Sequence, residues 1–117
     1  MSFSFSHEKI GNLNVFNVKG YVDKEAGKSL RLKVEEKVNA GETLFLLDFS
    51  LAPLVNSTGL AEVIDLVSLK GSNSKLNFAF SGLSTVCQFS FNSVGIFHYA
   101  QAFTSRSEAL LGLKKEP

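Results

Sequence analysis

The chain has 117 residues, of which 44% are hydrophobic and 20% are charged, and twelve basic against eleven acidic side chains give a formal charge of +1. This length predicts a single domain with one core, spanning residues 1–117, and this composition excludes a disordered chain. The balanced charge argues against nucleic acid or an anionic membrane surface as a partner.

The scarcity of metal-binding side chains excludes several classes of site. Cys87 is the only cysteine, which rules out an internal disulfide, and with only His7 and His98 as imidazoles the chain has little material for a zinc site. The first residues lack a basic region followed by a long apolar stretch, and no run of about 18 apolar residues occurs. We therefore expect a cytoplasmic protein with no metal and no membrane span.

The first half of the chain predicts a hairpin, a helix and a central strand. Apolar and polar residues roughly alternate over residues 3–18 around a Gly-Asn pair, which is typical of a β-hairpin. Asp23 precedes a segment in which apolar residues recur every four positions until about Gly41, as in an amphipathic helix with an N-cap. The continuous apolar run over residues 44–49 predicts a strand that is covered on both faces.

The second half predicts alternating helices and strands. The predicted elements are a helix beginning at residues 56–59, a strand over residues 76–80, a Phe-rich helix over residues 82–91, a short strand over residues 96–99, and a last helix opened by a capping box of Ser105 and Glu108. Strands that alternate with helices are parallel and joined by right-handed crossovers. The fold class is therefore α/β, with a mixed, mostly parallel sheet of about five strands and about four helices.

A search for catalytic groups favours a protein that is not an enzyme. The sequence contains no glycine-rich phosphate loop, no paired histidines at helical spacing and no Gly-x-Ser-x-Gly elbow. Cys87 falls on the predicted inner face of a helix, which favours a buried structural thiol, and His98 lies among aromatic residues as a packed or edge-strand histidine does. The eleven phenylalanines are expected mostly in the core, although some could serve a partner surface.

The polar residues Asn56, Ser57, Thr58 and Gly59 lie between a buried strand and an apolar helix. Asn, Ser and Thr side chains accept hydrogen bonds from unpaired helix amides, so helix initiation alone explains such a tetrad. A second explanation is a switch, because a phosphate added to a hydroxyl at a helix N-terminus meets amides and a dipole that accommodate its negative charge. The tetrad taken by itself leaves both explanations open.

The order of several motifs resembles the STAS domains of sulphate transporters and anti-sigma factor antagonists. Residues 47–49 followed by residues 56–60 (Asn-Ser-Thr-Gly-Leu) resemble the family's Asp-Ser-Ser-Gly-Leu region, and residues 20–23 (Gly-Tyr-Val-Asp) look like its Gly-x-x-Asp. Residues 76–82 resemble its fourth strand and turn, and residues 91–97 its later Phe-x-x-x-Gly-Leu-Phe segment. The resemblance covers nearly the whole chain and implies one STAS domain over residues 1–117.

The resemblance also implies a function and a site. It places the phosphoacceptor at Ser57, with Thr58 as the adjacent alternative, and a docking surface at Asp23, Asn56, Ser57, Thr58 and Gly59. The unmodified form would bind an anti-sigma factor that is also an ATP-dependent serine kinase, phosphorylation would end the binding, and a serine phosphatase would restore it. By this resemblance the chain is a substrate and binding partner, needs no cofactor and regulates transcription.

One position departs from the family, and one alternative stays open. Asn56 stands where the family has an aspartate, which removes a negative charge beside Ser57, although an asparagine still caps a helix and still forms hydrogen bonds. The alternative function is a phosphorylation-independent STAS scaffold or adaptor whose partner contacts the Phe-rich surface instead. The sequence leaves open whether the chain forms a homodimer and which sigma factor or kinase it meets.

Overall fold

The sheet begins with the predicted hairpin. In the computed structural model, which describes residues 2–114, β1 (Ser4–Ile10) pairs antiparallel with β2 (Leu13–Lys19). Gly11 adopts a φ of 62° in the two-residue turn between them, a left-handed conformation that glycine reaches without the steric cost of a Cβ atom. The hairpin therefore forms where the Gly-Asn pair interrupts the alternating pattern.

The remaining strands extend the sheet in parallel. β3 (Leu44–Leu51), β4 (Asn77–Ser81) and β5 (Ala100–Phe103) follow in the order β1-β2-β3-β4-β5, and each of the three later pairs is parallel. Each crossover advances by one strand in the same direction, so right-handed connections bring the crossover helices to one face. The predicted α/β class and mixed, mostly parallel sheet are confirmed.

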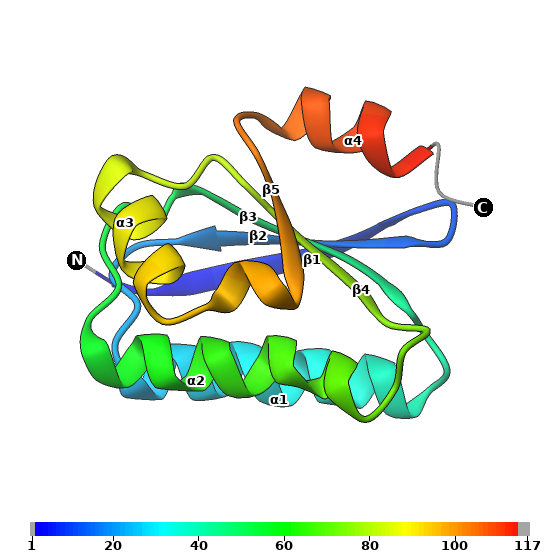
Figure 1. The fold of residues 1–117 in the computed structure, drawn as a ribbon, viewed down its shortest axis with the longest axis horizontal. Helices are drawn as coiled ribbons and strands as arrows, with labels where there is room; N and C mark the ends of the chain where they lie inside the picture. The colour runs from blue at the N-terminus through cyan, green and yellow to red at the C-terminus, as the bar shows by residue number, and fades with distance from the viewer. Residues whose placement is uncertain (1, 115–117) are drawn as a thin grey trace.

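The helices form layers on both faces of this sheet. α1 (Lys24–Asn39), α2 (Ser57–Val67), which continues into the short η1 (Ser68–Gly71), and α3 (Thr85–Ser93) contribute to one core, whereas α4 (Arg106–Lys114) covers the opposite face. In Figure 1, α1 and α2 run side by side below the strands and α4 lies above them. Within residues 2–114, no helix combines the length and the apolar character needed to cross a membrane.

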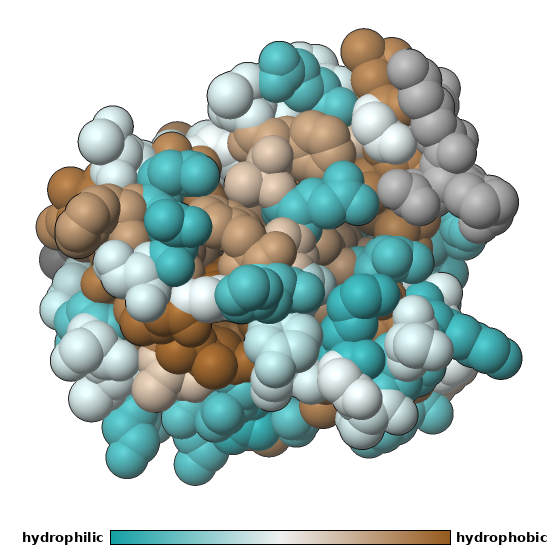
Figure 2. Space-filling model, in the orientation of Figure 1, coloured by the Kyte–Doolittle hydropathy of each residue, from teal (hydrophilic) through white to brown (hydrophobic). Residues whose placement is uncertain are grey.

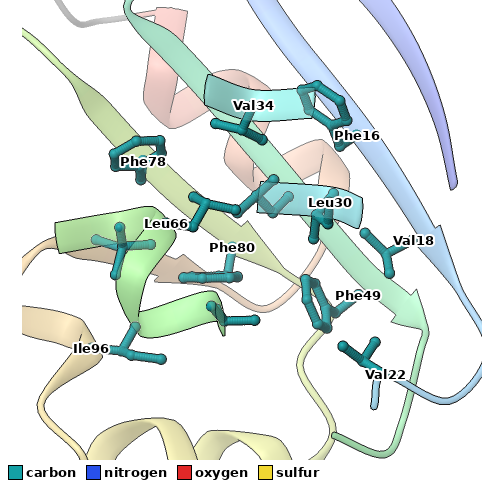
Figure 3. Close-up of a cluster of buried hydrophobic side chains, with 14 of the residues drawn as sticks. Phe16, Val18, Val22, Leu30, Val34, Phe49, Leu66, Phe78, Phe80 and Ile96 are labelled. Atoms are coloured by element: carbon teal, nitrogen blue, oxygen red, sulfur yellow. The ribbon is translucent and has the colours of Figure 1, made fainter. Parts of the chain in front are cut away.

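The buried strand β3 separates the two cores. Phe45, Leu47 and Phe49 point toward α1 and α2, and Leu46 points toward α4, because successive side chains of a strand alternate between faces. Figure 3 shows side chains of the larger core filling the space between sheet and helices. The continuous apolar run of β3 thus reflects burial on both faces, as predicted.

Phenylalanines form much of the larger core. The rings of Phe49, Phe80 and Phe91 contact one another edge to face, with centroids 5.2–5.9 Å apart, a geometry that the ring quadrupole favours. Cys87 is also buried, on the inner face of α3 as predicted. Phe89 differs from the other phenylalanines because 76% of its surface is exposed.

The prediction of a strand over residues 96–99 is wrong. Residues Ile96–His98 form a short 3-10 helix, η2, and the strand β5 begins at Ala100. Gly95 adopts a φ of 80° at the end of α3, and this turn directs the Ile96 side chain into the core. His98 is accordingly an exposed residue of η2 and belongs to no strand.

The capping box of the last helix forms only in part. The Ser105 hydroxyl accepts a hydrogen bond from the Glu108 amide at 3.2 Å, which is the first half of the motif. The Glu108 carboxylate accepts instead from the hydroxyl of Thr104. The start of α4 at Arg106 still agrees with the predicted position.

The inward face of α1 gives a matched test of the fold. Leu30 is fully buried and Leu32, two residues later in the same helix, is 50% exposed. We expect Leu30→Ala to lower the free energy of unfolding by about 2–5 kcal/mol because it leaves a cavity, and Leu32→Ala to change it by less than about 0.5 kcal/mol. Urea unfolding followed by circular dichroism measures both, and equal losses would contradict the assigned helix orientation.

Candidate functional site

Two helices begin side by side where β2 and β3 end. The segment before α1 joins the segment before α2 through a parallel bridge between Val22 and Val55. The Val22 amide donates to the Leu54 carbonyl at 3.0 Å, and the Asn56 amide donates to the Val22 carbonyl at 3.1 Å. The structure therefore brings together the two motifs that lie 33 residues apart at Asp23 and Asn56 in the sequence.

Asp23 and Asn56 cap the two helices. The Asp23 carboxylate accepts from the Ala26 amide at 2.9 Å, and the Asn56 side-chain oxygen accepts from the Gly59 amide at 2.8 Å. Both residues have the extended backbone of an N-cap. Asn56 rather than Ser57 is thus the cap of α2, and Ser57 is the first helical residue.

The two hydroxyls of the tetrad differ in their surroundings. The Thr58 hydroxyl donates to the Asn56 side-chain oxygen at 3.0 Å. Within residues 2–114, no hydrogen bond or ion pair engages the side chain of Ser57, and both side chains are exposed. Of these two exposed hydroxyls, only that of Thr58 therefore has a hydrogen bond within the described residues.

Gly59 lies where the first turn of α2 meets the segment before α1. A Cβ atom at this position would come within 2.3 Å of the Val22 carbonyl oxygen and 2.9 Å of that of Asp23. A Cβ atom on Gly27 would likewise lie 2.9 Å from the Gly59 carbonyl oxygen. The two glycines thus allow the helices to approach closely at the site, and the contact of Gly59 with a partner stays a prediction.

An ion pair holds the same two helices together one to two turns further along. Arg31 of α1 contacts the Glu62 carboxylate of α2 at 2.8 Å and the Glu35 carboxylate of its own helix at 3.0 Å. Hydrogen bonds to Glu62 and then to Glu35 raise the pKa of Arg31 above its ordinary value, so the guanidinium stays charged. The Val22–Val55 bridge on one side of the glycine contact and this ion pair on the other therefore fix the relative position of the two caps.

The loop that leads to the tetrad is anchored on α3. The Ser84 hydroxyl donates to the Pro53 carbonyl at 2.8 Å, and the Cys87 thiol contacts the same oxygen at 3.4 Å. Ser84 also caps α3 by accepting from the Cys87 amide at 3.1 Å. This anchor was not predicted, although a serine at the start of a predicted helix is a usable signal for the cap.

Exposed apolar side chains lie in the loops that carry the caps and on α3, and no local sequence pattern identified them individually. Tyr21 and Leu54 are exposed in the two loops that carry the caps, and Val86 and Phe89 are exposed on α3. Figure 2 shows apolar atoms gathered at the left, where α3 lies in Figure 1. The predicted site residues are thus bordered by apolar surface on the side of α3.

The remaining reactive side chains lie apart from the tetrad. His7 of β1 forms a hydrogen bond with Asn14 at 2.8 Å, and its ring lies 4.7 Å from that of Phe16 at a tilt of 40°. His98 lies in η2. In the described part of the chain, no three His, Cys, Asp or Glu side chains come together as a metal site requires. A shallow hollow of about 220 Å³ over β1 and β2 includes none of the predicted site residues.

The close approach at Gly59 predicts a strong effect of a single methyl group. We expect Gly59→Ala to lower the free energy of unfolding by about 2–3 kcal/mol, because the methyl group would overlap the Val22 carbonyl. Gly71→Ala is the matched control, because its methyl group would lie 3.9 Å from the nearest atom. Urea unfolding of both variants checks this, and a stable Gly59→Ala protein would contradict the packing.

The cap of α2 predicts a difference between two substitutions at Asn56. Asn56→Ala removes the acceptor for the Gly59 amide and should cost about 1 kcal/mol of stability. Asn56→Asp keeps an acceptor oxygen and should retain the stability at neutral pH. Thermal unfolding at neutral pH separates them, and an equal loss in both variants would show that the side chain does not act through capping.

Comparison with known proteins identifies the fold. No protein-family model and no curated protein sequence matches the chain. Among solved structures, a Thermotoga maritima protein described as a candidate anti-sigma factor antagonist superposes with a TM-score of 0.83 at 14% identity, covering 95% of each chain. An anti-sigma factor antagonist from Mycobacterium paratuberculosis gives 0.82 at 15% identity, covering 97% of this chain and 96% of its own.

A third similar protein has been solved in an unphosphorylated and a phosphorylated form. The anti-sigma factor antagonist SpoIIAA in its unphosphorylated form gives a TM-score of 0.76 at 16% identity, covering 97% of this chain and 100% of its own. The phosphorylated Bacillus form gives 0.74 at 18% identity, covering 94% and 99%. Together with the strand order and the helix layers, these superpositions show that the chain has the STAS fold of the anti-sigma factor antagonists.

Proposed function

We propose that the chain is an anti-sigma factor antagonist whose binding is switched off by phosphorylation of Ser57. In its unmodified form it would bind an anti-sigma factor that is also an ATP-dependent serine kinase, and a serine phosphatase would restore binding after phosphorylation. The observation that carries this proposal is the exposed Ser57 hydroxyl at the start of α2, beside the Asp23 cap. The fold around it is shared with the anti-sigma factor antagonist SpoIIAA, which is known in unphosphorylated and phosphorylated forms. The proposed role is binding and regulation, with no catalytic step by the chain itself.

The surroundings of the tetrad favour Ser57 over Thr58 as the acceptor. The Thr58 hydroxyl already donates to Asn56, so a kinase would have to break that hydrogen bond. The Ser57 side chain is exposed in the first turn of the helix, where a kinase active site has direct access. The preference for Ser57 over Thr58 therefore rests on the hydrogen bonds of the two hydroxyls as well as on their positions in the sequence.

The electrostatics at the start of α2 suit an added phosphate. The first turn of α2 contains no acidic residue and its cap is the neutral amide of Asn56, so no carboxylate of that turn offsets the partial positive charge of the helix terminus. A phosphoserine adds about −1.5 to −2 charge units. The helix terminus accommodates this charge, and modification changes the surface without requiring the domain to unfold.

The same charge explains how binding would end. Asp23 caps the neighbouring helix, and the Val22–Val55 bridge holds the two caps in adjacent segments. A phosphate on Ser57 would place a second, larger negative charge next to that carboxylate. A partner surface that is complementary to a single carboxylate would then meet excess negative charge, which disfavours docking.

The contacts of Asn56 support the switch despite the change from the family's aspartate. Its side-chain oxygen forms both capping hydrogen bonds, to Gly59 and to Thr58, that a carboxylate would form. The backbone that presents Ser57 therefore keeps its geometry. Because Asn56 is neutral, the kinase partner would be one that does not require a negative charge beside the acceptor serine. This difference from the family would make recognition specific to this chain's own partner.

A pull-down comparison tests the switch. Tagged Ser57→Ala should capture the kinase partner from extracts of the native cells, whereas Ser57→Asp should capture at least about tenfold less, which corresponds to about 1.4 kcal/mol. Ser74→Asp is the charge control, because Ser74 is exposed in the connection between η1 and β4 and lies in neither motif. Quantitative mass spectrometry of the captured proteins provides the measurement. Equal capture by both Ser57 variants would favour the phosphorylation-independent scaffold.

The modification itself can be observed directly. Protein purified from its native cells should carry a phosphate that fragment mapping assigns to Ser57 and that a serine phosphatase removes. Ser57→Ala should lose this phosphate while Thr58→Ala keeps it, because the Thr58 hydroxyl is engaged by Asn56. A phosphate that persists in Ser57→Ala would assign the acceptor elsewhere and overturn this part of the proposal.

A further inference from the structure

Two polar side chains are buried next to each other on the face of the sheet that α4 covers. Asp48 of β3 and Ser81 of β4 are register partners in adjacent parallel strands, and neighbouring strands lie about 4.8 Å apart. Leu46 and Ala79, two residues earlier in each strand, pack against α4, and residues two positions apart share a face. Asp48 is 8% exposed and Ser81 is fully buried. The carboxylate and the hydroxyl are therefore neighbours with little contact with solvent.

The Ser81 hydroxyl lacks a hydrogen bond. Within the described residues, it is the one buried side-chain nitrogen or oxygen that has no partner. A buried hydroxyl without a partner destabilises the fold, because it has lost its hydrogen bonds to water and gained none in return. Native proteins satisfy nearly all such groups with protein atoms, ordered water or bound ions. The Ser81 hydroxyl therefore indicates a small bound species at this position.

The Asp48 carboxylate is only partly compensated. Its Oδ1 accepts from the Ser50 amide at 3.0 Å. No other hydrogen bond and no ion pair reaches this side chain from the residues that the structure describes. A buried carboxylate without a cationic partner is costly. Asp48 therefore leaves a negative charge unbalanced beside the unpartnered hydroxyl of Ser81.

Arg106 does not supply the missing positive charge. Its Nη1 donates to the Asn17 side-chain oxygen at 2.9 Å, and its Nη2 pairs with the Glu8 carboxylate at 3.1 Å. Glu8 already balances the charge of Arg106. The guanidinium is thus engaged with β1 and β2, although Asn17 is the register partner of Asp48 on the neighbouring strand.

We propose that Asp48 and Ser81 bind a monovalent cation, sodium or potassium, between the ends of β3 and β4. A carboxylate oxygen and a hydroxyl oxygen are hard ligands, which suit hard cations. One carboxylate balances one positive charge, whereas a calcium site draws on several acidic ligands, and no cluster of three His, Cys, Asp or Glu side chains occurs among the described residues. A water molecule alone would satisfy Ser81 and leave the charge of Asp48 unbalanced.

The proposed ion would stabilise the edge of the sheet from which two loops leave. A Cβ atom on Gly82 would come within 2.9 Å of the Ser50 Cα atom, so β3 and β4 stay in close contact directly after Asp48 and Ser81. From this edge the chain continues to α2 and to α3. A cation held by both strands would stabilise their ends whether or not Ser57 is phosphorylated.

Thermal unfolding at constant ionic strength tests the proposal. Sodium chloride or potassium chloride replaces choline chloride stepwise at a total of about 200 mM, which keeps the screening of charges equal. Choline is too large for the space between two neighbouring side chains. A site with a single carboxylate binds weakly, so we expect half-saturation at about 10 mM. At about 100 mM the bound ion should raise the melting temperature by about 4 °C, and the ion with the larger rise is the one that the site prefers.

Three variants make the test specific. Asp48→Asn removes the charge and keeps an acceptor for the Ser50 amide, and Ser81→Ala removes the unpartnered oxygen, so both should abolish the response to the ion. Ser81→Ala loses no hydrogen bond and should fold even if Asp48→Asn does not, which circular dichroism checks. Asp65→Asn is the matched control, because Asp65 is an exposed carboxylate of α2 and its loss should leave the response intact.

Sodium-23 NMR measures binding to the folded chain directly. The unmodified chain and Asp65→Asn should broaden the sodium resonance, added potassium should reverse the broadening, and Asp48→Asn and Ser81→Ala should not broaden it. A melting temperature that ignores both ions overturns the proposal and leaves a water molecule alone as the partner of Ser81. A response that persists in Ser81→Ala or in folded Asp48→Asn also overturns it, because the salt would then act elsewhere on the chain.

Discussion

The contact between Gly59 and the backbone of residues 22–23 is the constraint on which the candidate site depends. With no Cβ atom at Gly59, the first turn of α2 lies directly against the Val22 and Asp23 carbonyls. The bridge between Val22 and Val55 requires this approach, and it sets the Asp23 and Asn56 caps in adjacent segments. A larger residue would separate the two helix N-termini, and the surface that presents Ser57 beside Asp23 would be lost even if every strand still formed.

Most of the fold could be predicted from periodic patterns because those patterns reflect burial. Alternation marked the hairpin, a run without alternation marked β3, and four-residue spacing marked α1, which begins as predicted directly after Asp23. The pairing of residues 20–23 with residues 54–59 was available only through the family resemblance. No local sequence pattern tells which loops meet. The loops meet here because β2 and β3 are parallel neighbours, which places their carboxyl ends at one edge of the sheet.

The failures of prediction arose where tertiary contacts outweigh local preference. Ile96 belongs to η2 instead of a strand because the turn at Gly95 directs it into the core. The anchor of Pro53 on Ser84 and Cys87 joins segments more than thirty residues apart, which no spacing rule detects. The phenylalanines were expected mostly in the core, with some open to a partner surface, and hydrophobicity alone does not tell that Phe89 is one that faces solvent.

The assembly of the site from two separate crossover units has a consequence for the newly made chain. Residues 20–23 emerge from the ribosome well before residues 54–59, and the bridge between them needs β3 and α2 already docked on the hairpin and α1. Local segments of an incomplete chain therefore do not display the paired helix termini. Any protein that binds both termini at once would therefore bind finished molecules and leave nascent or misfolded chains unbound.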